Sequence, residues 1–194
     1  AAESERLRRV HPATIAELRS TGLMRLMQPT RFGGSELGLN DLMNVVFELA
    51  RGCASTAWVY SNLASHSWNL GQFELQAQED IWNEDPNALA ATGLAFPCGR
   101  AVPVEGGYRL TGLWPFGSGV DASTWMLVGA MTERTGGAPE RRFFLVPQAD
   151  FQSQDNWSSY GLTATGSHDV KVEDAFVPEH RTVSAEIFAA GQNL

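Results

Sequence analysis

Apolar and polar side chains alternate with a helical period through the first part of the chain. Apolar residues lie between charged ones over Pro12–Ser20, and the following Thr21-Gly22 predicts the end of that helix. Apolar residues then recur every three or four positions up to Gly52, starting after Asn40, a favourable N-cap with Asp41 in the first turn. These patterns predict two amphipathic helices.

A connector and two further helices complete this helical part. Proline and paired glycines break regular structure over Met24–Gly34, which is expected to form the connector. Ser55 is expected to cap a helix that ends near Phe73, and a short helix is predicted over Leu75–Trp82.

The pattern changes at Asp85-Pro86, after which glycine, proline and β-branched residues separate short apolar runs. Glu105-Gly106-Gly107 lies between two of these runs and Thr135–Pro139 between two others, and both segments are typical of hairpin turns. Strands are predicted over Ala101–Val104, Tyr108–Thr111, Thr124–Ala130, Arg142–Val146 and His168–Val172.

Together the two patterns predict the α+β class, with a helical domain followed by an antiparallel β-domain. We expect the helical domain over residues 1–85 and the β-domain over residues 86–182. Residues 183–194 are expected to begin a C-terminal helical domain, because Thr182–Leu194 has the pattern of an amphipathic helix that stops early.

Charge and cysteine content narrow the class of partner. The net charge is −8 and no basic run is interleaved with aromatic residues, so nucleic acid is not an expected partner. Cys53 and Cys98 lie far apart and outside any Cys/His cluster, which argues against a disulfide framework and a zinc site. Ala1–Val10 is charged where a signal peptide needs apolar residues, and no apolar stretch is long enough to span a bilayer. We therefore expect a soluble cytoplasmic protein without a metal.

The segment Leu110–Trp125 is the main candidate for chemistry, since GxGxxG, P-loop, HExxH and GxSxG signatures are absent. It reads LTGLWPFGSGVDASTW, and its proline and glycines exclude a helix and let backbone approach a flat ligand. In one interpretation Trp114 or Phe116 packs on an isoalloxazine ring while Ser118 hydrogen-bonds its edge. In the other, the segment is a β-bulge whose aromatic residues belong to the core.

Several motifs, in the expected order, resemble the acyl-CoA dehydrogenase superfamily. They are GLMRLMQPTRFGG, CASTAWVYSNLASH, GGYRLTGLWPFGSGVDAS and VEDAFVP, and together they cover nearly the whole chain. The resemblance implies a helical domain, a β-barrel domain and a C-terminal four-helix bundle, of which the bundle is missing here. It also implies a flavin between barrel and bundle, and a homotetramer.

Departures from the superfamily pattern indicate one group within it. The acid and the Ser-Asp pair of the Thr-Glu-Pro...Gly-Ser-Asp stretch are absent over Thr92–Arg100, which weakens the case for a CoA thioester as substrate. Trp114–Gly119 instead resembles the Trp-x-Phe-x-Ser-Gly loop of the p-hydroxyphenylacetate hydroxylase group, oxygenases that hydroxylate phenols. That group implies reduced FMN or FAD from a separate flavin reductase, and hydroxylation of an aromatic or polyketide-like substrate through a C4a-hydroperoxide.

The same resemblance assigns site residues. Ser118 is expected at flavin N5 and His66 opposite the substrate, where an imidazole favours the reactive phenolate. From its spacing alone, His66 shares a helix face with polar residues, and this pattern favours a solvated or capping histidine. Thr92, Trp114, Phe116 and Gly117 complete the implied cofactor site, and Thr92 and Phe96 the implied substrate site.

Weaker assignments and other functions stay open at this point. His168 is expected in a loop that approaches a neighbouring flavin or subunit, and Arg100 as an exposed charge. A dehydrogenase would instead pass a hydride from an acyl-CoA or similar substrate to N5, using a carboxylate in the missing C-terminal helices. A non-catalytic assembly subunit is the third alternative.

Overall fold

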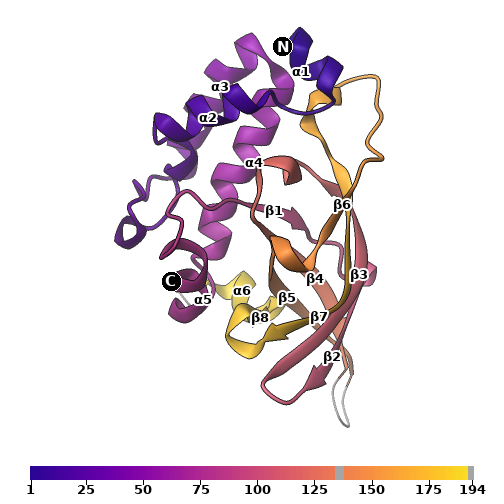
Figure 1. The fold of residues 1–194 in the computed structure, drawn as a ribbon. Helices are drawn as coiled ribbons and strands as arrows, with labels where there is room; N and C mark the ends of the chain where they lie inside the picture. Colours follow the sequence, from indigo (N-terminus) through magenta and orange to yellow (C-terminus); the bar gives the residue numbers. More distant parts are fainter. Residues whose placement is uncertain (134–137, 192–194) are drawn as a thin grey trace.

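A computed structural model describes residues 1–133 and 138–191 and confirms the α+β class (Figure 1). The helices lie along one side of a curved sheet, and α4 runs between the other helices and the strands. The helical part comprises α1 (Ala2–Leu7), α2 (Pro12–Ser20), α3 (Leu39–Gly52), α4 (Ala54–Leu70) and α5 (Leu75–Trp82).

Two predicted helix caps are wrong. Asn40 lies inside the first turn of α3, and Gly38 is the N-cap, with its backbone N–H donating to the Asp41 carboxylate at 3.2 Å. Ser55 also lies inside its helix, and its hydroxyl donates to Glu5 Oε1 on α1 at 2.7 Å. A bond to a distant helix therefore takes the place of the local cap that the sequence suggested.

One eight-stranded sheet forms in the described residues, in the order β6-β7-β3-β2-β4-β5-β8, with β1 added beside β4. Most pairs are antiparallel, but β1 and β2 run parallel to β4, one after the other along its length. The strands are β1 (Ala90–Gly93), β2 (Gly99–Val104), β3 (Gly107–Gly117), β4 (Trp125–Thr132), β5 (Glu140–Pro147), β6 (Gln152–Gln154), β7 (His168–Pro178) and β8 (Thr182–Ser184).

The five predicted strands coincide with parts of β2, β3, β4, β5 and β7, whereas the pattern missed β1, β6 and β8. The turn at Glu105–Gly107 is confirmed, because Gly106 adopts φ 77° between the paired β2 and β3. The turn predicted at Thr135–Pro139 lies largely outside the described residues. The helix predicted from Thr182 begins at Ala185 as α6 (Ala185–Ala190), since residues 182–184 form β8.

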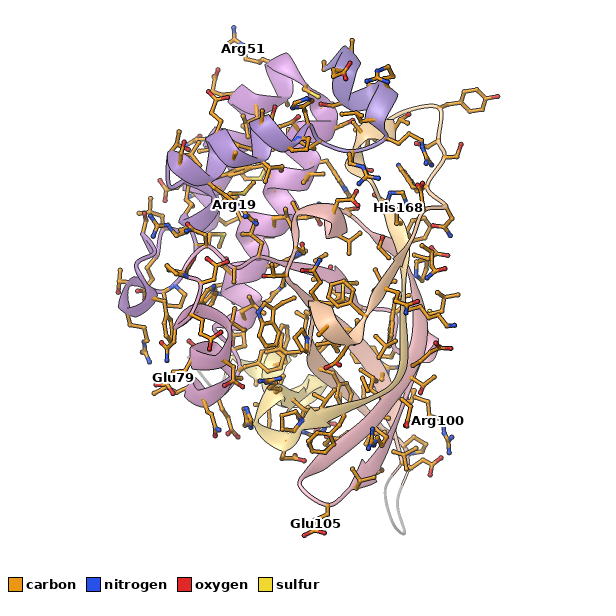
Figure 2. The ribbon with its side chains drawn as sticks, in the orientation of Figure 1. Arg19, Arg51, Glu79, Arg100, Glu105 and His168 are labelled. Atoms are coloured by element: carbon orange, nitrogen blue, oxygen red, sulfur yellow. The ribbon has the colours of Figure 1, made fainter. Side chains whose placement is uncertain are left out.

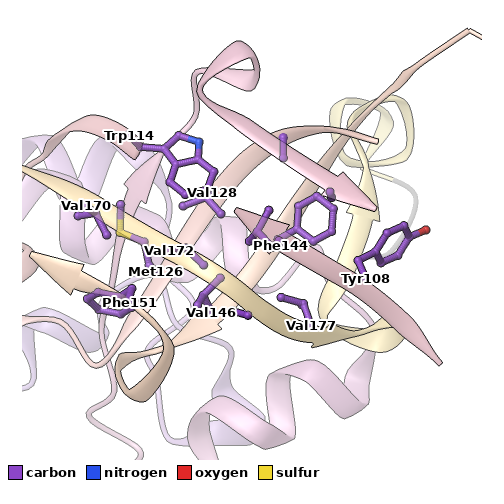
Figure 3. Close-up of a cluster of buried hydrophobic side chains, with 14 of the residues drawn as sticks. Tyr108, Trp114, Met126, Val128, Phe144, Val146, Phe151, Val170, Val172 and Val177 are labelled. Carbon is purple, nitrogen blue, oxygen red and sulfur yellow. The ribbon is translucent and has the colours of Figure 1, made fainter. Parts of the chain in front are cut away.

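The sheet encloses a core in which Trp114 is the largest side chain (Figure 3). Its indole is fully buried, and its Nε1–H donates to the Gly129 carbonyl oxygen at 2.8 Å. A Cβ at Gly99 would lie 2.3 Å from Trp114 Cζ2, and Gly93 and Gly112 leave as little room, with 2.6 and 2.5 Å to the same side chain. We call Gly93, Gly99 and Gly112 the glycine pocket of Trp114.

A second core fills the space between the helices and the outer face of β4 and β5. The short turn η7 (Glu179–Arg181) is tied to α5 at the edge of this core. Asp80 Oδ2 on α5 lies 2.7 Å from His180 Nε2 and 2.6 Å from Arg181 Nε. This cluster joins the helical part to the end of the sheet.

Candidate functional site

A bulge in β3 separates the two aromatic side chains of the Trp114–Gly119 segment. The pairing of β3 with β7 shifts register between Trp114 and Gly117, and Phe116 adopts φ 63°, in the left-handed region. Trp114 consequently points into the core, while the side chain of Phe116 is 67% exposed and meets the Trp157 ring edge-on at 6.2 Å. The predicted β-bulge with a core aromatic residue is therefore present, with Trp114 in the core. Phe116 is exposed, as an aromatic residue that packs on a ligand must be.

Trp114 was also a candidate for packing on a cofactor. Its side chain is 0% exposed, so no part of it is left for a ligand to contact, and we assign it a structural role. Gly117 too is buried, and a Cβ there would lie 2.9 Å from Val170 Cγ2 and 3.0 Å from the His168 carbonyl oxygen. The glycine at 117 thus allows close packing of β3 on β7, and its place in the cofactor site stays a prediction from the resemblance.

Ser118 lies directly after the bulge and belongs to a chain of hydroxyl groups. Its Oγ lies 2.7 Å from Ser167 Oγ, which in turn lies 2.7 Å from Thr165 Oγ1. The half-exposed Trp58 on α4 donates its Nε1–H to Ser118 Oγ at 3.2 Å. Ser118 is half-buried, and its hydroxyl is held by Trp58 and Ser167. Sequence patterns did not predict a role for Thr165 or Ser167 beside Ser118, because only the fold brings them to this loop.

His66 lies on α4 against β1, and its ring is held in one tautomer. Its Nδ1 lies 2.8 Å from the Ala90 carbonyl oxygen. Because a carbonyl oxygen can only accept a hydrogen bond, Nδ1 carries the hydrogen. Nε2 is then an acceptor and lies 3.4 Å from the Thr92 hydroxyl. Burial lowers the pKa of His66 to about 4, although the hydrogen bond with Ala90 acts in the opposite direction. His66 is thus a neutral, buried acceptor and not a solvated residue.

We group five side chains near α4 and β1 under the name α4–β1 face: Trp58, His66, Thr92, Phe116 and Ser118. Trp58 and His66 are eight residues apart on α4, which is about 12 Å along the helix axis. The Thr92 hydroxyl is bonded to His66, and the Ser118 hydroxyl to Trp58. The face therefore has a hydroxyl at each end, each held by a residue of α4.

Phe96 follows β1 and is half-buried. Its ring lies 4.9 Å from that of Phe143, and the Arg141 guanidinium lies over it at 5.7 Å. Part of the Phe96 ring is still accessible, so the structure leaves its predicted role in the substrate site untested.

A cavity of about 920 Å³ lies beside the α4–β1 face and not within it. It opens between α4, α5 and the segment before α3, and Ser65 and Asn69 bring polar groups to it from α4. Its lining includes neither His66 nor Ser118, so the cavity and the hydroxyl groups are separate features.

His168 is placed differently from the sequence expectation. It is the first residue of β7, is 1% exposed, and lies at the end of the sheet near α1, opposite Arg100 and Glu105 (Figure 2). Its Nδ1 accepts the backbone N–H of Trp157 at 3.2 Å, and its Nε2 lies 3.7 Å from Asp121 Oδ2. A buried His168 holds loops together, whereas Arg100 is exposed, as predicted.

Two kinds of site are not found in the described part of the chain. No three His, Cys, Asp or Glu residues there come together in a way that could hold a metal ion. No helix among the same residues has the length and hydrophobicity to span a bilayer.

The sequence and fold are similar to known oxygenases. Residues 1–82 match the family described as acyl-CoA dehydrogenase, N-terminal domain. The chain is 38% identical, over its full length, to the oxygenase subunit HsaA of a flavin-dependent monooxygenase from Rhodococcus jostii, of which it covers 50%. It is 36% identical to the oxygenase component of p-hydroxyphenylacetate 3-hydroxylase from Acinetobacter baumannii, over 100% of this chain and 46% of that one.

Among solved structures, XiaF from Streptomyces sp. in complex with FADH2 and glycerol superposes with a TM-score of 0.91. It is 35% identical, and the match covers 97% of this chain and 48% of that one. These findings confirm the resemblance drawn from the motifs. The chain spans about half the length of the curated relatives it matches.

Proposed function

From the match of residues 1–82 to the acyl-CoA dehydrogenase N-terminal domain family, we propose that the chain is part of a flavin-dependent monooxygenase. The enzyme would use reduced flavin and O2 to hydroxylate an aromatic or polyketide-like small molecule. The similarity of the whole chain to oxygenase components supports this proposal. One structural observation carries it: the bulge exposes the Phe116 ring two residues before Ser118, whose hydroxyl is held by Trp58 and Ser167.

The residues of the α4–β1 face fit a flavin ring. Phe116 and Trp58 offer exposed aromatic surface, and Ser118 offers a hydroxyl oxygen fixed by hydrogen bonds from within the protein. Reduced flavin, when bound, supplies two electrons to O2, so that one oxygen atom enters the substrate and the other leaves as water. The role of these side chains would be to hold the flavin ring, to orient its polar edge and to exclude water from it.

At the other end of the face, Thr92 and His66 suit a substrate hydroxyl. With Nδ1–H directed to Ala90, His66 Nε2 accepts a hydrogen bond from the Thr92 hydroxyl, and the Thr92 oxygen can then accept a hydrogen bond from the substrate hydroxyl. His66 is 6% exposed and lies behind Thr92, so we propose that it orients the substrate through Thr92. A pKa of about 4 makes neutral His66 a good acceptor but a weak base until a phenolate charge forms beside it.

Several finer features are proposals that rest on the relatives. A flavin reductase as separate partner follows from the similarity to oxygenase components, and FAD is favoured over FMN by the XiaF complex with FADH2. The homotetramer and the cytoplasmic location stay predictions from the sequence.

The experiment that tests the function mixes the full-length protein, loaded with reduced flavin, with O2 in a stopped-flow spectrometer. A transient absorbance distinct from reduced and oxidised flavin, together with ¹⁸O from ¹⁸O2 in a hydroxylated aromatic product, is the expected result. Direct return to oxidised flavin, with reduction by an acyl-CoA, would support a dehydrogenase instead. Absence of flavin binding in both redox states would refute the proposal and leave an assembly role.

A further inference from the structure

We propose that Thr165 is a positioning residue that sets, through Ser167, the direction of the Ser118 hydroxyl. In this arrangement Ser118 offers a lone pair, and the site prefers a ligand that presents an N–H. The inference rests on the proposed function and on the contact with flavin N5 that the resemblance implies for Ser118. Because N5 carries a hydrogen in reduced flavin and none in oxidised flavin, Thr165 favours binding of the reduced form.

The direction follows from the number of protons that the hydroxyl groups can donate. Thr165 Oγ1 donates to the Leu162 carbonyl oxygen at 2.9 Å, and a threonine hydroxyl has a single proton. In the 2.7 Å contact with Thr165, Ser167 is therefore the donor. By the same reasoning Ser118 donates to Ser167 in their 2.7 Å contact.

Ser118 is then left with acceptor capacity alone. Its proton is directed to Ser167, and one lone pair accepts the Nε1–H of Trp58, since an indole can only donate. The second lone pair is free for a ligand. A ligand N–H can donate a hydrogen bond to this lone pair. A ligand nitrogen without a hydrogen would face the Ser118 oxygen and form no hydrogen bond with it, because the Ser118 proton is directed to Ser167.

The opposite direction costs one hydrogen bond. If Thr165 donated to Ser167 and Ser167 to Ser118, the Ser118 proton would be free for a bare nitrogen. The Leu162 carbonyl would then lose the Thr165 hydroxyl, although it would keep the backbone N–H of Thr165 at 3.1 Å and the Trp157 indole at 3.4 Å. The preference for reduced flavin is thus set by one bond to a carbonyl that Ser118 does not touch.

Burial allows the chain of hydroxyl groups to keep its direction. Thr165 is 2% and Ser167 5% exposed, so water is poorly placed to replace either partner. The backbone N–H of Gly119 donates to the Thr165 carbonyl oxygen at 3.0 Å, which fixes Thr165 to the loop that carries Ser118.

The test compares dissociation constants of reduced and oxidised flavin, measured anaerobically and aerobically, for the full-length protein and three variants. Thr165→Val keeps the shape and removes the hydroxyl, so Ser167 can donate only to Ser118. We expect the preference for reduced over oxidised flavin to fall about fivefold, as for one hydrogen bond. Thr165→Ser keeps the hydroxyl and should keep the preference. Thr163→Val is the matched control, because the Thr163 hydroxyl donates to the Ser159 carbonyl oxygen, outside this chain of hydroxyl groups.

The outcomes separate this inference from the proposed function. If both flavins bind and Thr165→Val leaves their ratio unchanged, the positioning role is wrong and the proposed function stands. If Thr165→Val weakens both forms equally and lowers the melting temperature, Thr165 has only a structural role and the inference fails. If neither form binds to the unmodified protein, the proposed function fails and the inference fails with it.

Discussion

Protonation of His66 should control the stability of the chain below neutral pH. The pKa of His66 falls from 6.5 to about 4, because the folded chain buries the ring against Ala90. The unfolded chain therefore binds a proton more readily than the folded chain between these values. The contribution of neutral His66 is fully present above about pH 6.5 and is lost as the pH falls toward 4.

The size of this effect follows from the two pKa values. A difference of about 2.5 pH units corresponds to about 3 kcal/mol over the whole range, and about 2 kcal/mol of it is lost between pH 7 and pH 5. The assay is urea denaturation at several pH values in this interval. His66→Asn is the matched variant, since the asparagine amide can still donate to the Ala90 carbonyl oxygen but does not titrate.

Unfolding free energies of the two proteins should diverge as the pH rises from 5 to 7, with the original chain gaining about 2 kcal/mol on the variant. Parallel curves would refute the reasoning, because they would show that His66 has the same pKa folded and unfolded. A histidine ring signal that titrates near pH 6.5 in NMR spectra of the folded chain, and disappears in the variant, would refute it independently.

Three further predictions concern packing, an ion-pair cluster and the candidate site. Gly99→Ala, whose new Cβ would lie 2.3 Å from Trp114, should lower the unfolding free energy by about 3 kcal/mol, whereas Gly161→Ala, in open space, should change it little. Asp80→Asn should cost about 1 kcal/mol at pH 7. Burial opposes ionisation of Asp80, but hydrogen bonds with His180 and Arg181 hold its pKa below the usual value, so the cost should vanish in acid as the carboxyl protonates. Ser118→Ala should shorten the transient in the stopped-flow experiment about tenfold, and an unchanged decay would remove Ser118 from the mechanism.

Local patterns were sufficient for most of the fold. The period of apolar residues and the turn at Gly106 predicted the helical part, its change to strands and the main hairpin. The pattern missed β1, because Ala90 and Ala91 lack the β-branched side chains typical of strands. They form a strand only by pairing with β4, which lies far along the chain. The predicted cap at Ser55 was wrong for a similar reason, since its hydroxyl donates to Glu5 on another helix, whereas the cap predicted at Asn40 was wrong by two residues, because α3 begins after Gly38.

In the candidate site, too, features set by neighbouring residues could be predicted from the sequence, and contacts between residues far apart in the chain could not. The sequence located the loop of Ser118, because proline, glycine and aromatic residues cluster there. It could not tell which aromatic residue faces outward, since the bulge reverses the alternation between Trp114 and Phe116. Thr165 and Ser167 gave no signal, because hydroxyl groups far along the chain meet Ser118 only in the folded protein.

The glycine pocket of Trp114 makes the effects of mutations at its positions depend on one another. An alanine at Gly99 collides with the indole, and a smaller side chain at position 114 leaves a void and deprives the Gly129 carbonyl of its donor. Each change alone is costly, whereas an alanine at 99 combined with a smaller ring at 114 places the methyl group of one in the void of the other, provided that Ala130, whose Cβ would lie 2.8 Å from that methyl group, also shifts. Viable sequences should therefore carry correlated substitutions at these positions, so that evolution crosses between two packing solutions by paired steps and not by single ones.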